Sequence, residues 1–296
     1  MTENTAPTKT WLVGDLLQTT TVFLGQKGLA TPRLEAELLL AEILALTRMQ
    51  LYVHFDRVMT EQELEAYRGL IRRRIKREPS AYILGRREFY LLNFKVTPDT
   101  LIPRPETELL VDEAIALAKP LTEPLIWDLG CGCGAIALAL AKNLPQSRVT
   151  ATDLSLPALE VAKGNALVLG LSDQVEFLAG DLTHPVAGRQ FNLICANLPY
   201  VPQAEIETLD PDVSQFEPRL ALDGGPDGLD PFRRLLPEVS VLLKPGGYLL
   251  LEIHPPTLPD LTALIQQAQL AVQKVLVDYG KNNRVVVVKA DNRQTT

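Results

Sequence analysis

The chain has 296 residues, which is long for one domain and sufficient for two. Hydrophobic residues make up 46% and charged residues 22%, an ordinary globular balance with enough apolar material for a buried core. The net charge of −7 excludes a nucleic-acid-binding protein of the kind that is held by overall positive charge.

The sparse cysteines favour a reducing compartment. Cys131 and Cys133 are too close in sequence to pair easily, and Cys195 would be left over. Because no signal-peptide pattern is present either, we expect a cytoplasmic protein. No further Cys or His cluster completes a zinc site, so no metal is expected. No apolar run approaches the roughly 20 residues that a membrane-spanning helix needs.

The first part of the chain is predicted to be a small helical bundle. Residues 1–7 are polar and aperiodic, so we expect disorder there. Pro32 stands where a first helical residue should, and leucine and isoleucine then recur at helical spacing. Thr60 and Glu63 form a capping-box pattern that opens a second long helix. No strand-like alternation appears before Leu84.

A basic cluster lies at the end of that second helix and consists of Arg72, Arg73, Arg74, Lys76 and Arg77. It allows two interpretations: contact with the acidic surface of a partner, or a solvated helix face whose charge favours the helix C-terminus. The second is the more ordinary arrangement and is favoured. After the cluster, the aromatic residues of 85–98, with Asn93 between them, indicate a short hairpin. The proline-rich residues 102–105 then form the joint between two domains.

After Glu106 the pattern changes to alternating strands and helices. Strands are predicted at residues 125–129, 148–153, 175–178, 191–196, 248–253, 272–278 and 284–289. Helices are predicted at residues 135–142, 156–169, 229–243 and 258–268. This alternation predicts an α/β fold with a doubly wound, seven-stranded sheet. The short connection at 279–283 cannot hold a crossover helix, so the last two strands should be antiparallel.

The first of these strands ends in Asp128-Leu129-Gly130-Cys131-Gly132-Cys133-Gly134 and leads directly into a helix. Glycines let the chain turn tightly and let a ligand lie against the backbone, and the helix N-terminus suits a carboxylate. Asp153 ends the second strand, where an acidic side chain can accept both hydroxyls of a ribose. The pattern therefore predicts a nucleoside site; the alternative is that the glycines only build a tight turn.

The spacing D-x-G-x-G-x-G resembles motif I of the seven-stranded, Rossmann-like S-adenosylmethionine methyltransferases, whereas nicotinamide folds favour G-x-G-x-x-G. Asp181 and Leu182, after the third strand, lie at that family's adenine-contacting position. The contacts expected for S-adenosylmethionine are Gly130, Cys131, Gly132, Cys133, Gly134, Asp153, Asp181, Leu182 and Asn197.

The fourth strand ends in Asn197-Leu198-Pro199-Tyr200, beside the end of the first strand, so Asn197 should face the donor methyl group. An amide nitrogen is a poor nucleophile because its lone pair is delocalised into the carbonyl. The Asn197 side-chain oxygen and the Leu198 carbonyl can hold both N–H groups and favour the positive charge that develops. Tyr200 can cover the other face of the amide. The alternative is an ordinary strand-to-loop turn.

This motif resembles the Asn-Pro-Pro-Tyr signature of amino-methylating enzymes, which is known for glutamine amides and for exocyclic amines of bases. The resemblance implies that Asn197, Leu198, Pro199 and Tyr200 are the catalytic residues. Leu198 replaces the first proline, which keeps the carbonyl acceptor but loses some stiffness.

Further segments make the chain resemble one family, the HemK/PrmC glutamine methyltransferases of peptide chain release factors. The segments, besides the two motifs above, are residues 77–85 with 88–90, 101–108, and 217–219 with 225–229. The resemblance implies three parts: a five-helix substrate-docking domain at 1–84, a hairpin and linker at 85–104, and the methyltransferase domain at 105–296. The chain departs from the family at Glu252-Ile253-His254, where a glycine usually follows Glu-Ile, and no catalytic role is transferred there.

The resemblance implies methylation of the side-chain nitrogen (N5) of the glutamine in the Gly-Gly-Gln motif of release factors. The release factor would be the protein partner, and we expect a monomer with no nucleic-acid or membrane partner. The alternative enzyme is an adenine-N6 methyltransferase acting on nucleic acid, which the acidic balance and the linker segment disfavour. A third interpretation, an inactive S-adenosylmethionine-binding scaffold, is disfavoured by the intact Asn197 and Tyr200.

Overall fold

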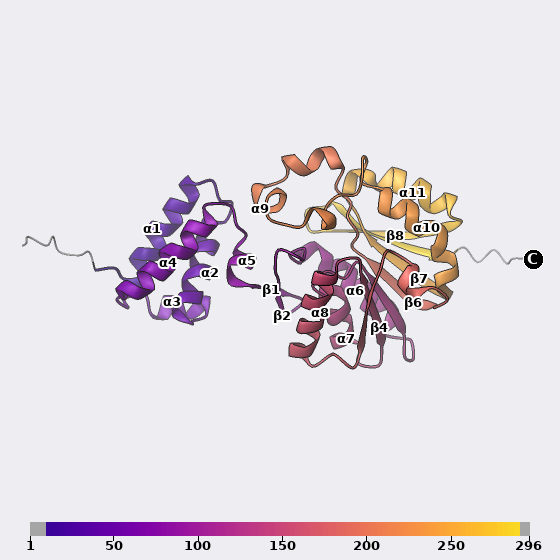
Figure 1. Cartoon of the computed structure of the whole chain (residues 1–296), viewed down its shortest axis with the longest axis horizontal. Helices are drawn as coiled ribbons and strands as arrows, with labels where there is room; N and C mark the ends of the chain where they lie inside the picture. Colours follow the sequence, from indigo (N-terminus) through magenta and orange to yellow (C-terminus); the bar gives the residue numbers. More distant parts are fainter. Residues whose placement is uncertain (1–9, 291–296) are drawn as a thin grey trace, which may run out of the picture. The chain divides into compact units, whose positions relative to one another are not determined.

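The computed structural model describes residues 10–290, and the chain divides into two compact units between Leu84 and Gly85 (Figure 1). The predicted disorder of residues 1–7 lies outside the described residues. Each unit has its own cluster of buried hydrophobic side chains. None of the helices within residues 10–290 is long and apolar enough to cross a membrane.

The first unit is helical, as predicted. Its helices are α1 (Val13–Gln26), α2 (Pro32–Leu44), α3 (Arg48–Val53), α4 (Glu61–Arg74) and α5 (Ser80–Leu84). Pro32 is the first residue of α2, and α4 begins with the predicted capping box. In that box Thr60 Oγ1 accepts from the Glu63 N–H, and the Glu63 carboxylate accepts from the Thr60 N–H. Local sequence signals therefore set where these helices begin.

The basic cluster is largely engaged within this unit. Arg72, Arg73 and Lys76 are exposed, as the prediction of a solvated helix face requires, whereas Arg74 is buried and pairs with Glu35 at 3.0 Å. Arg73 pairs with Glu78, and Arg77 donates to backbone carbonyl groups that follow α1. These contacts join the end of α4 to α2, to the residues that follow α4 and to the segment after α1. Part of the cluster therefore contributes to packing inside its own unit.

Seven strands of the described chain form one sheet in the second unit, in the order β5-β4-β3-β6-β7-β9-β8. The strands are β3 (Leu125–Leu129), β4 (Arg148–Asp153), β5 (Val175–Ala179), β6 (Phe191–Ala196), β7 (Leu243–Glu252), β8 (Leu270–Val277) and β9 (Asn283–Ala290). β3 to β7 are parallel, and β9 is antiparallel to both β7 and β8, which confirms the predicted sheet. The strand order reverses between β3 and β6, where ligands bind in folds of this kind.

Helices cover both faces of the sheet (Figure 1). They are α6 (Glu108–Ala118), α7 (Ala135–Asn143) and α8 (Leu156–Leu169) on one face, and α10 (Asp230–Leu242) and α11 (Leu258–Gln267) on the other. A short helix, η1 (Pro105–Thr107), precedes α6. The long loop after β6 carries η3 (Gln203–Thr208), α9 (Pro211–Ser214) and η4 (Arg219–Ala221). The loop and η1 contribute residues to the site described below.

Strand β7 begins earlier than the sequence predicted. The prediction placed a turn before Tyr248, but Leu243 already pairs with Phe191. The register shifts before Leu193 pairs with Tyr248, so the chain enters the sheet through an irregular stretch rather than a free loop. A Cβ at Gly247 would lie 2.9–3.1 Å from backbone carbonyl oxygens, which explains the glycine there.

The predicted hairpin is present, but its turn is not at Asn93. It consists of β1 (Arg86–Phe89) and β2 (Leu92–Lys95), and Asn93 lies in the ladder. The turn residues are Tyr90 and Leu91, with φ of 50° and 60°. This conformation is unfavourable for side chains of that size, and the Glu108 carboxylate holds it by accepting from the Tyr90 N–H at 2.8 Å.

Asn165 of α8 joins the hairpin to the chain that follows β3. Its Oδ1 accepts from the Lys95 N–H at 2.8 Å, and its Nδ2 donates to the Lys95 carbonyl at 3.0 Å. The same Nδ2 donates to the carbonyl of Cys133 at 2.9 Å. One buried side chain thus connects β2 with the glycine-rich turn of the second unit.

Candidate active site

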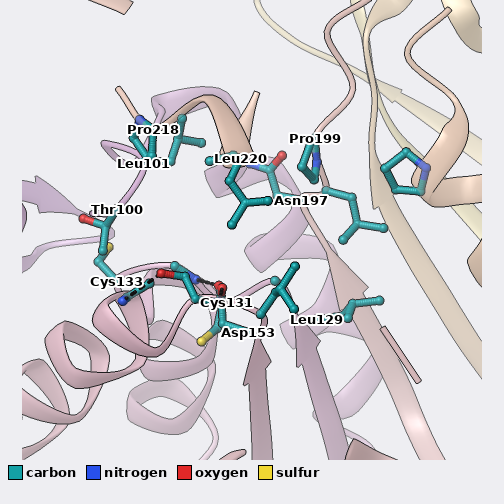
Figure 2. A pocket seen from close by; sticks show the side chains of 18 of the residues that line it. Thr100, Leu101, Leu129, Cys131, Cys133, Asp153, Asn197, Pro199, Pro218 and Leu220 are labelled. Atoms are coloured by element: carbon teal, nitrogen blue, oxygen red, sulfur yellow. Dashed lines mark hydrogen bonds between the residues drawn. The ribbon is translucent and has the colours of Figure 1, made fainter. Parts of the chain in front are cut away.

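A cavity of about 540 Å³ lies at the carboxyl ends of β3, β4 and β6 (Figure 2). The predicted site residues in its wall are Gly130, Cys131, Gly132, Cys133, Asp153, Asp181, Leu182, Asn197, Leu198 and Pro199. Two predicted residues, Gly134 and Tyr200, are not part of the wall. The fold thus brings residues of four separate segments to the edge where the strand order reverses.

The glycine loop is held in its turn by the neighbouring strand. The N–H groups of Gly130 and Cys131 both donate to the Thr152 carbonyl at 2.9 Å. Gly130 has φ of 74°, and a Cβ there would lie 3.3 Å from Leu198 Cδ2. Gly134 instead precedes α7, and its Cβ would lie 3.2 Å from Ala162 of α8. The first of these glycines opens the cavity, and the last permits close helix packing.

Asp153 orders two backbone segments at the cavity. Its Oδ2 accepts from the Gly132 N–H at 2.8 Å, and its Oδ1 accepts from the Ser155 N–H at 2.8 Å. Burial raises the pKa of Asp153, and the two backbone donors oppose that shift. Each carboxylate oxygen has a further lone pair, so the side chain can still accept from hydroxyl groups of a ligand.

Below the loop, Asp128 is fully buried at the end of β3. Its Oδ2 accepts from the Ala137 N–H at 2.9 Å, while Oδ1 has no hydrogen-bond partner among the described residues. Burial raises the pKa of Asp128 to about 7. Burial likewise raises the pKa of Cys133 to about 12, so this thiol is neutral and packs as a small apolar group.

Asp181, one of the two residues that the sequence assigned to the adenine-contacting position, pairs with Arg234 of α10. Both residues line the cavity. Leu182 has φ of 45° and packs against the core that includes α10. The sequence pointed to Asp181 and Leu182 but not to Arg234, because the residues of this pair are 53 positions apart.

Asn197 is held by a chain of hydrogen bonds that runs from the cavity wall, where Thr107 also lies, to the buried Glu252. Its Nδ2 donates to Thr107 Oγ1 at 3.3 Å, and the Thr107 hydroxyl donates to Glu252 Oε2 at 2.6 Å. The Tyr200 hydroxyl donates to Glu252 Oε1 at 3.0 Å. Burial raises the pKa of Glu252, and the two hydroxyl donors oppose the shift. Three segments that are distant in sequence therefore meet at one buried carboxylate.

Tyr200 lies outside the cavity wall and has two contacts with other segments of the second unit. The sequence placed its ring over the substrate amide, but the ring stacks on His254, with centroids 6.4 Å apart and planes at 10°. The physical reason is the buried Glu252 carboxylate, which takes the Tyr200 hydroxyl as one of its two donors. Tyr200 therefore anchors the end of the motif to Glu252 and His254.

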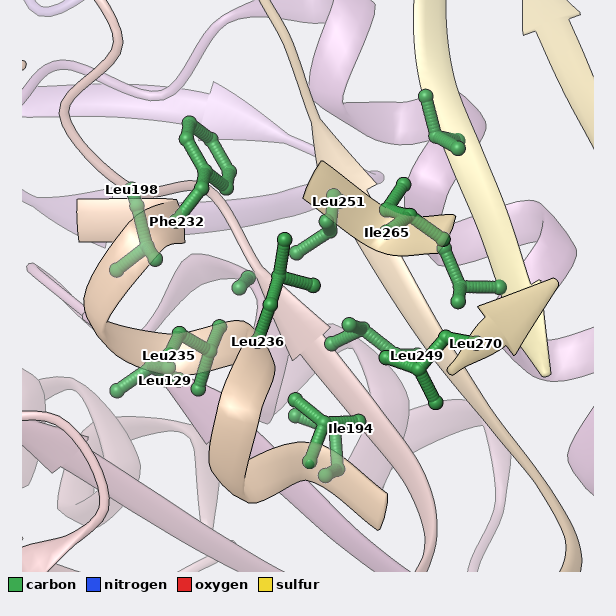
Figure 3. Close-up of a cluster of buried hydrophobic side chains, with 14 of the residues drawn as sticks. Leu129, Ile194, Leu198, Phe232, Leu235, Leu236, Leu249, Leu251, Ile265 and Leu270 are labelled. Carbon is green, nitrogen blue, oxygen red and sulfur yellow. The ribbon is translucent and has the colours of Figure 1, made fainter. Parts of the chain in front are cut away.

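Leu198 combines a buried side chain with a cavity-lining position. The side chain is 5% exposed and belongs to the core cluster that also contains Phe232 and Leu236 (Figure 3). Because it also faces the Gly130 turn, it fixes the motif through packing. Packing thus supplies part of the restraint that a proline ring would otherwise give.

The linker before α6 is joined to the loop after β6. Glu217, in that loop, accepts from the Ile102 N–H at 3.1 Å and pairs with Arg104. Its carboxylate is buried, and the linker residues Leu101 and Arg104 line the cavity. The sequence identified this linker as the joint between two domains but did not identify Glu217 as its partner.

Comparisons with known proteins identify the family of the chain. The sequence model of the PrmC N-terminal domain matches residues 15–85, and that of the methyltransferase small domain matches residues 106–211. The release factor glutamine methyltransferase of Geobacter sulfurreducens is 45% identical over 82% of this chain and 84% of its own. That of Chlorobaculum tepidum is 40% identical over 93% of this chain and 96% of its own.

The chain belongs to the release factor glutamine methyltransferase family. The family resemblance drawn from the sequence is therefore confirmed, and so are the methyltransferase activity and the use of S-adenosylmethionine. Leu198 occupies the position of the first proline in the Asn-Pro-Pro-Tyr signature that the sequence resembles.

Solved structures resemble the chain in fold. The ribosomal protein L11 methylase of Lactobacillus delbrueckii subsp. bulgaricus superimposes with a TM-score of 0.50 and 17% identity, over 67% of this chain and 84% of its own. The hMettl16 catalytic domain, solved in complex with the MAT2A 3'UTR hairpin 6, superimposes with a TM-score of 0.55 and 16% identity. The match covers 80% of this chain and 86% of that domain's chain. At these identities the likeness concerns the fold alone.

Proposed function

We propose that this chain transfers the methyl group of S-adenosylmethionine to the side-chain amide nitrogen (N5) of the glutamine in the Gly-Gly-Gln motif of peptide chain release factors. The observation that carries the proposal is the orientation of Asn197. Its Nδ2 is engaged by Thr107, so its Oδ1 remains to accept an N–H from the substrate. An acceptor is what an amide nitrogen needs beside it when that nitrogen is methylated.

The residues present fit the cofactor. The glycines from Gly130 to Gly134 leave the backbone uncovered, and Asp153 offers acceptors for ribose hydroxyls. Asp181 and Leu182 border the adenine in this assignment, with Arg234 fixing the carboxylate. When bound, S-adenosylmethionine supplies a methyl group that is electrophilic because it is carried on a positively charged sulfur.

The chain's own groups then hold the nucleophile. Asn197 Oδ1 and the Leu198 carbonyl oxygen accept the two N–H groups of the glutamine amide and turn the face of its nitrogen toward the donor. As the new N–C bond forms, the bond between the methyl carbon and sulfur would break and leave S-adenosylhomocysteine, so the nitrogen becomes positive, and the two acceptors stabilise that charge. The alkylated nitrogen is strongly acidic, so one proton leaves to water without a strong base from the protein.

The opposite part of the cavity suits a narrow substrate. Leu101, Pro218 and Leu220 form an apolar border around it (Figure 2). Leu220 is exposed, so this border is open to solvent. Glycines have no side chains, so a glutamine that follows two of them can reach between such residues with little steric conflict.

The parts of the chain take different roles in this proposal. Residues 1–84 dock the release factor, 85–104 form the hairpin and linker, and 105–296 carry out the transfer. The enzyme acts as a cytoplasmic monomer on the folded factor and needs no nucleic acid. The net charge of −7 supports the last point.

Mass spectrometry tests the proposal directly. Purified enzyme, S-adenosylmethionine and a release factor should give one added methyl group on the tryptic peptide that contains Gly-Gly-Gln. A release factor with Gln→Glu in that motif should remain unmodified. The proposal fails if the peptide stays unmodified while adenine in DNA or RNA acquires the methyl group.

A further inference from the structure

The hydrogen bonds between Asn197 and Glu252 have a defined direction. Glu252 ends β7 with 2% of its surface exposed, and its two carboxylate oxygens accept from the hydroxyls of Thr107 and Tyr200. The Thr107 hydroxyl, at 2.6 Å, therefore donates its proton to Glu252, and its oxygen is left to accept. The Asn197 side chain supplies that donor through Nδ2. Glu252 thus determines that the Thr107 hydroxyl donates toward it, and Thr107 determines that Asn197 donates through Nδ2.

An asparagine amide fits the same space in two orientations, related by exchange of its oxygen and nitrogen. Only one of them presents an acceptor to the substrate. In the other, N–H groups of Asn197 would face N–H groups of the glutamine, which cannot accept and which become more positive during the transfer. The shape of the pocket alone does not select between the two orientations.

We propose that Glu252 and Thr107 are positioning residues for the methyl transfer: they fix the Asn197 amide with its oxygen toward the reacting nitrogen. This inference rests on the proposed function. A buried carboxylate costs free energy that an apolar residue would not, and the preceding residues of β7 at this depth, Leu249 to Leu251, are apolar. The orientation of the Thr107 hydroxyl, and through it of the Asn197 amide, accounts for a carboxylate at this position.

The first test removes the middle of the chain of hydrogen bonds. Thr107→Val keeps the side-chain shape and should lower kcat about 10- to 100-fold. The KM for release factor and the calorimetric affinity for S-adenosylhomocysteine should change much less than kcat, because the Asn197 acceptor matters most as positive charge develops on the nitrogen. Thr107→Ser should restore turnover. Thr262→Val is the matched control, since that hydroxyl donates to a backbone carbonyl in α11.

A second readout needs neither cofactor nor substrate. In full-length protein labelled with ¹⁵N-asparagine, the side-chain NH₂ signals of Asn197 can be assigned by their loss in Asn197→Ala. Thr107→Val should shift these signals, because one N–H loses its acceptor, and Thr262→Val should leave them in place. Unmoved signals in Thr107→Val would overturn the proposal even if activity fell.

The third test concerns the charge at Glu252. A glutamine has one acceptor oxygen, so it cannot accept from both hydroxyls, and Glu252→Gln should lower kcat about tenfold. Thr107→Val combined with Glu252→Gln should be no worse than the more damaging single variant, because both act through Asn197. Glu113→Gln, which alters a carboxylate paired with Lys274, is the control. Losses that multiply, or near-normal turnover in Thr107→Val, would overturn the proposal.

Failure of the proposed function would look different. Wild-type enzyme would then leave the release factor unmodified, while the Asn197 signals would still report whether Thr107 holds the amide. The two questions are therefore answered by separate measurements.

Discussion

Asp153 Oδ2 accepts a hydrogen bond from the Gly132 N–H at 2.8 Å, which ties the end of β4 to the glycine loop after β3. The other carboxylate oxygen accepts from Ser155, the residue that caps α8. The acidic side chain assigned to the ribose therefore also shapes the loop assigned to the rest of the cofactor.

Replacing Asp153 should weaken cofactor binding. For Asp153→Ala we expect a loss of about 1.5–3 kcal/mol in the binding of S-adenosylmethionine, the range for hydrogen bonds to a charged group. Isothermal calorimetry measures it, with the exposed Asp173→Ala as control. An affinity equal to that of the wild type would remove Asp153 from the site.

Removing the Asn197 side chain should affect turnover more than binding. Asn197→Ala deletes an acceptor that is most valuable as positive charge develops, so kcat should fall about 10²–10³-fold. Methyl transfer to a folded release factor at saturating cofactor is the assay. If kcat stays near that of the wild type, the amide is not held by this side chain.

Leu198→Pro separates the backbone role of this position from its packing role. The carbonyl oxygen remains, so turnover should be retained or slightly raised. The buried leucine side chain is lost from the core cluster, so we expect the free energy of unfolding to fall by about 1–3 kcal/mol. The midpoint of thermal unfolding should fall accordingly. Loss of activity in a variant that remains folded would show that the Leu198 side chain itself matters.

Asp128 should make the cofactor-free protein less stable as pH rises. Its pKa is raised from 3.8 to about 7, so the folded state binds the proton more tightly than the unfolded state. The resulting stability is complete below about pH 4 and is lost as the pH passes about 7. Urea unfolding across this window should show a shallower pH dependence for Asp128→Asn than for the wild type. Parallel profiles would place the titration elsewhere.

The second unit alone should bind cofactor but act poorly on its substrate. A fragment that starts at Gly85 keeps the hairpin, which Asn165 and Glu108 hold to the rest of the unit. We expect normal S-adenosylmethionine affinity by calorimetry and a large loss of kcat/KM on whole release factor. A short Gly-Gly-Gln peptide should be methylated equally by fragment and full chain. Equal activity on whole release factor would contradict a docking role for residues 1–84.

Local patterns predicted the parts of the site that are contiguous in sequence. The glycine loop, Asp153 and Asn197 lie at the ends of strands that the alternation with helices made recognisable, and parallel strands bring their carboxyl ends to one edge. The antiparallel end of the sheet followed from the length of one connection. These inferences need only the periodicity and the spacing of residues.

Contacts between distant segments were not predictable in this way. The turn at Tyr90 and Leu91 has no turn-forming residue, and it depends on Glu108 in another element. Glu252 did carry a signal, since it is an acidic residue at the end of an apolar strand. Its partner Thr107 lies 145 positions away, and no local pattern connects the two.

The bridging amide of Asn165 makes the hairpin and the glycine-rich turn a single cooperative element. Lys95 cannot separate from α8 without freeing the side chain that also holds the Cys133 carbonyl. Fraying of the hairpin would therefore loosen the cofactor loop, and a ligand that steadies the loop steadies the hairpin by the same amount. We therefore expect the opening of one segment to favour the opening of the other, although 32 residues separate Asn165 from Cys133 and 70 separate it from Lys95.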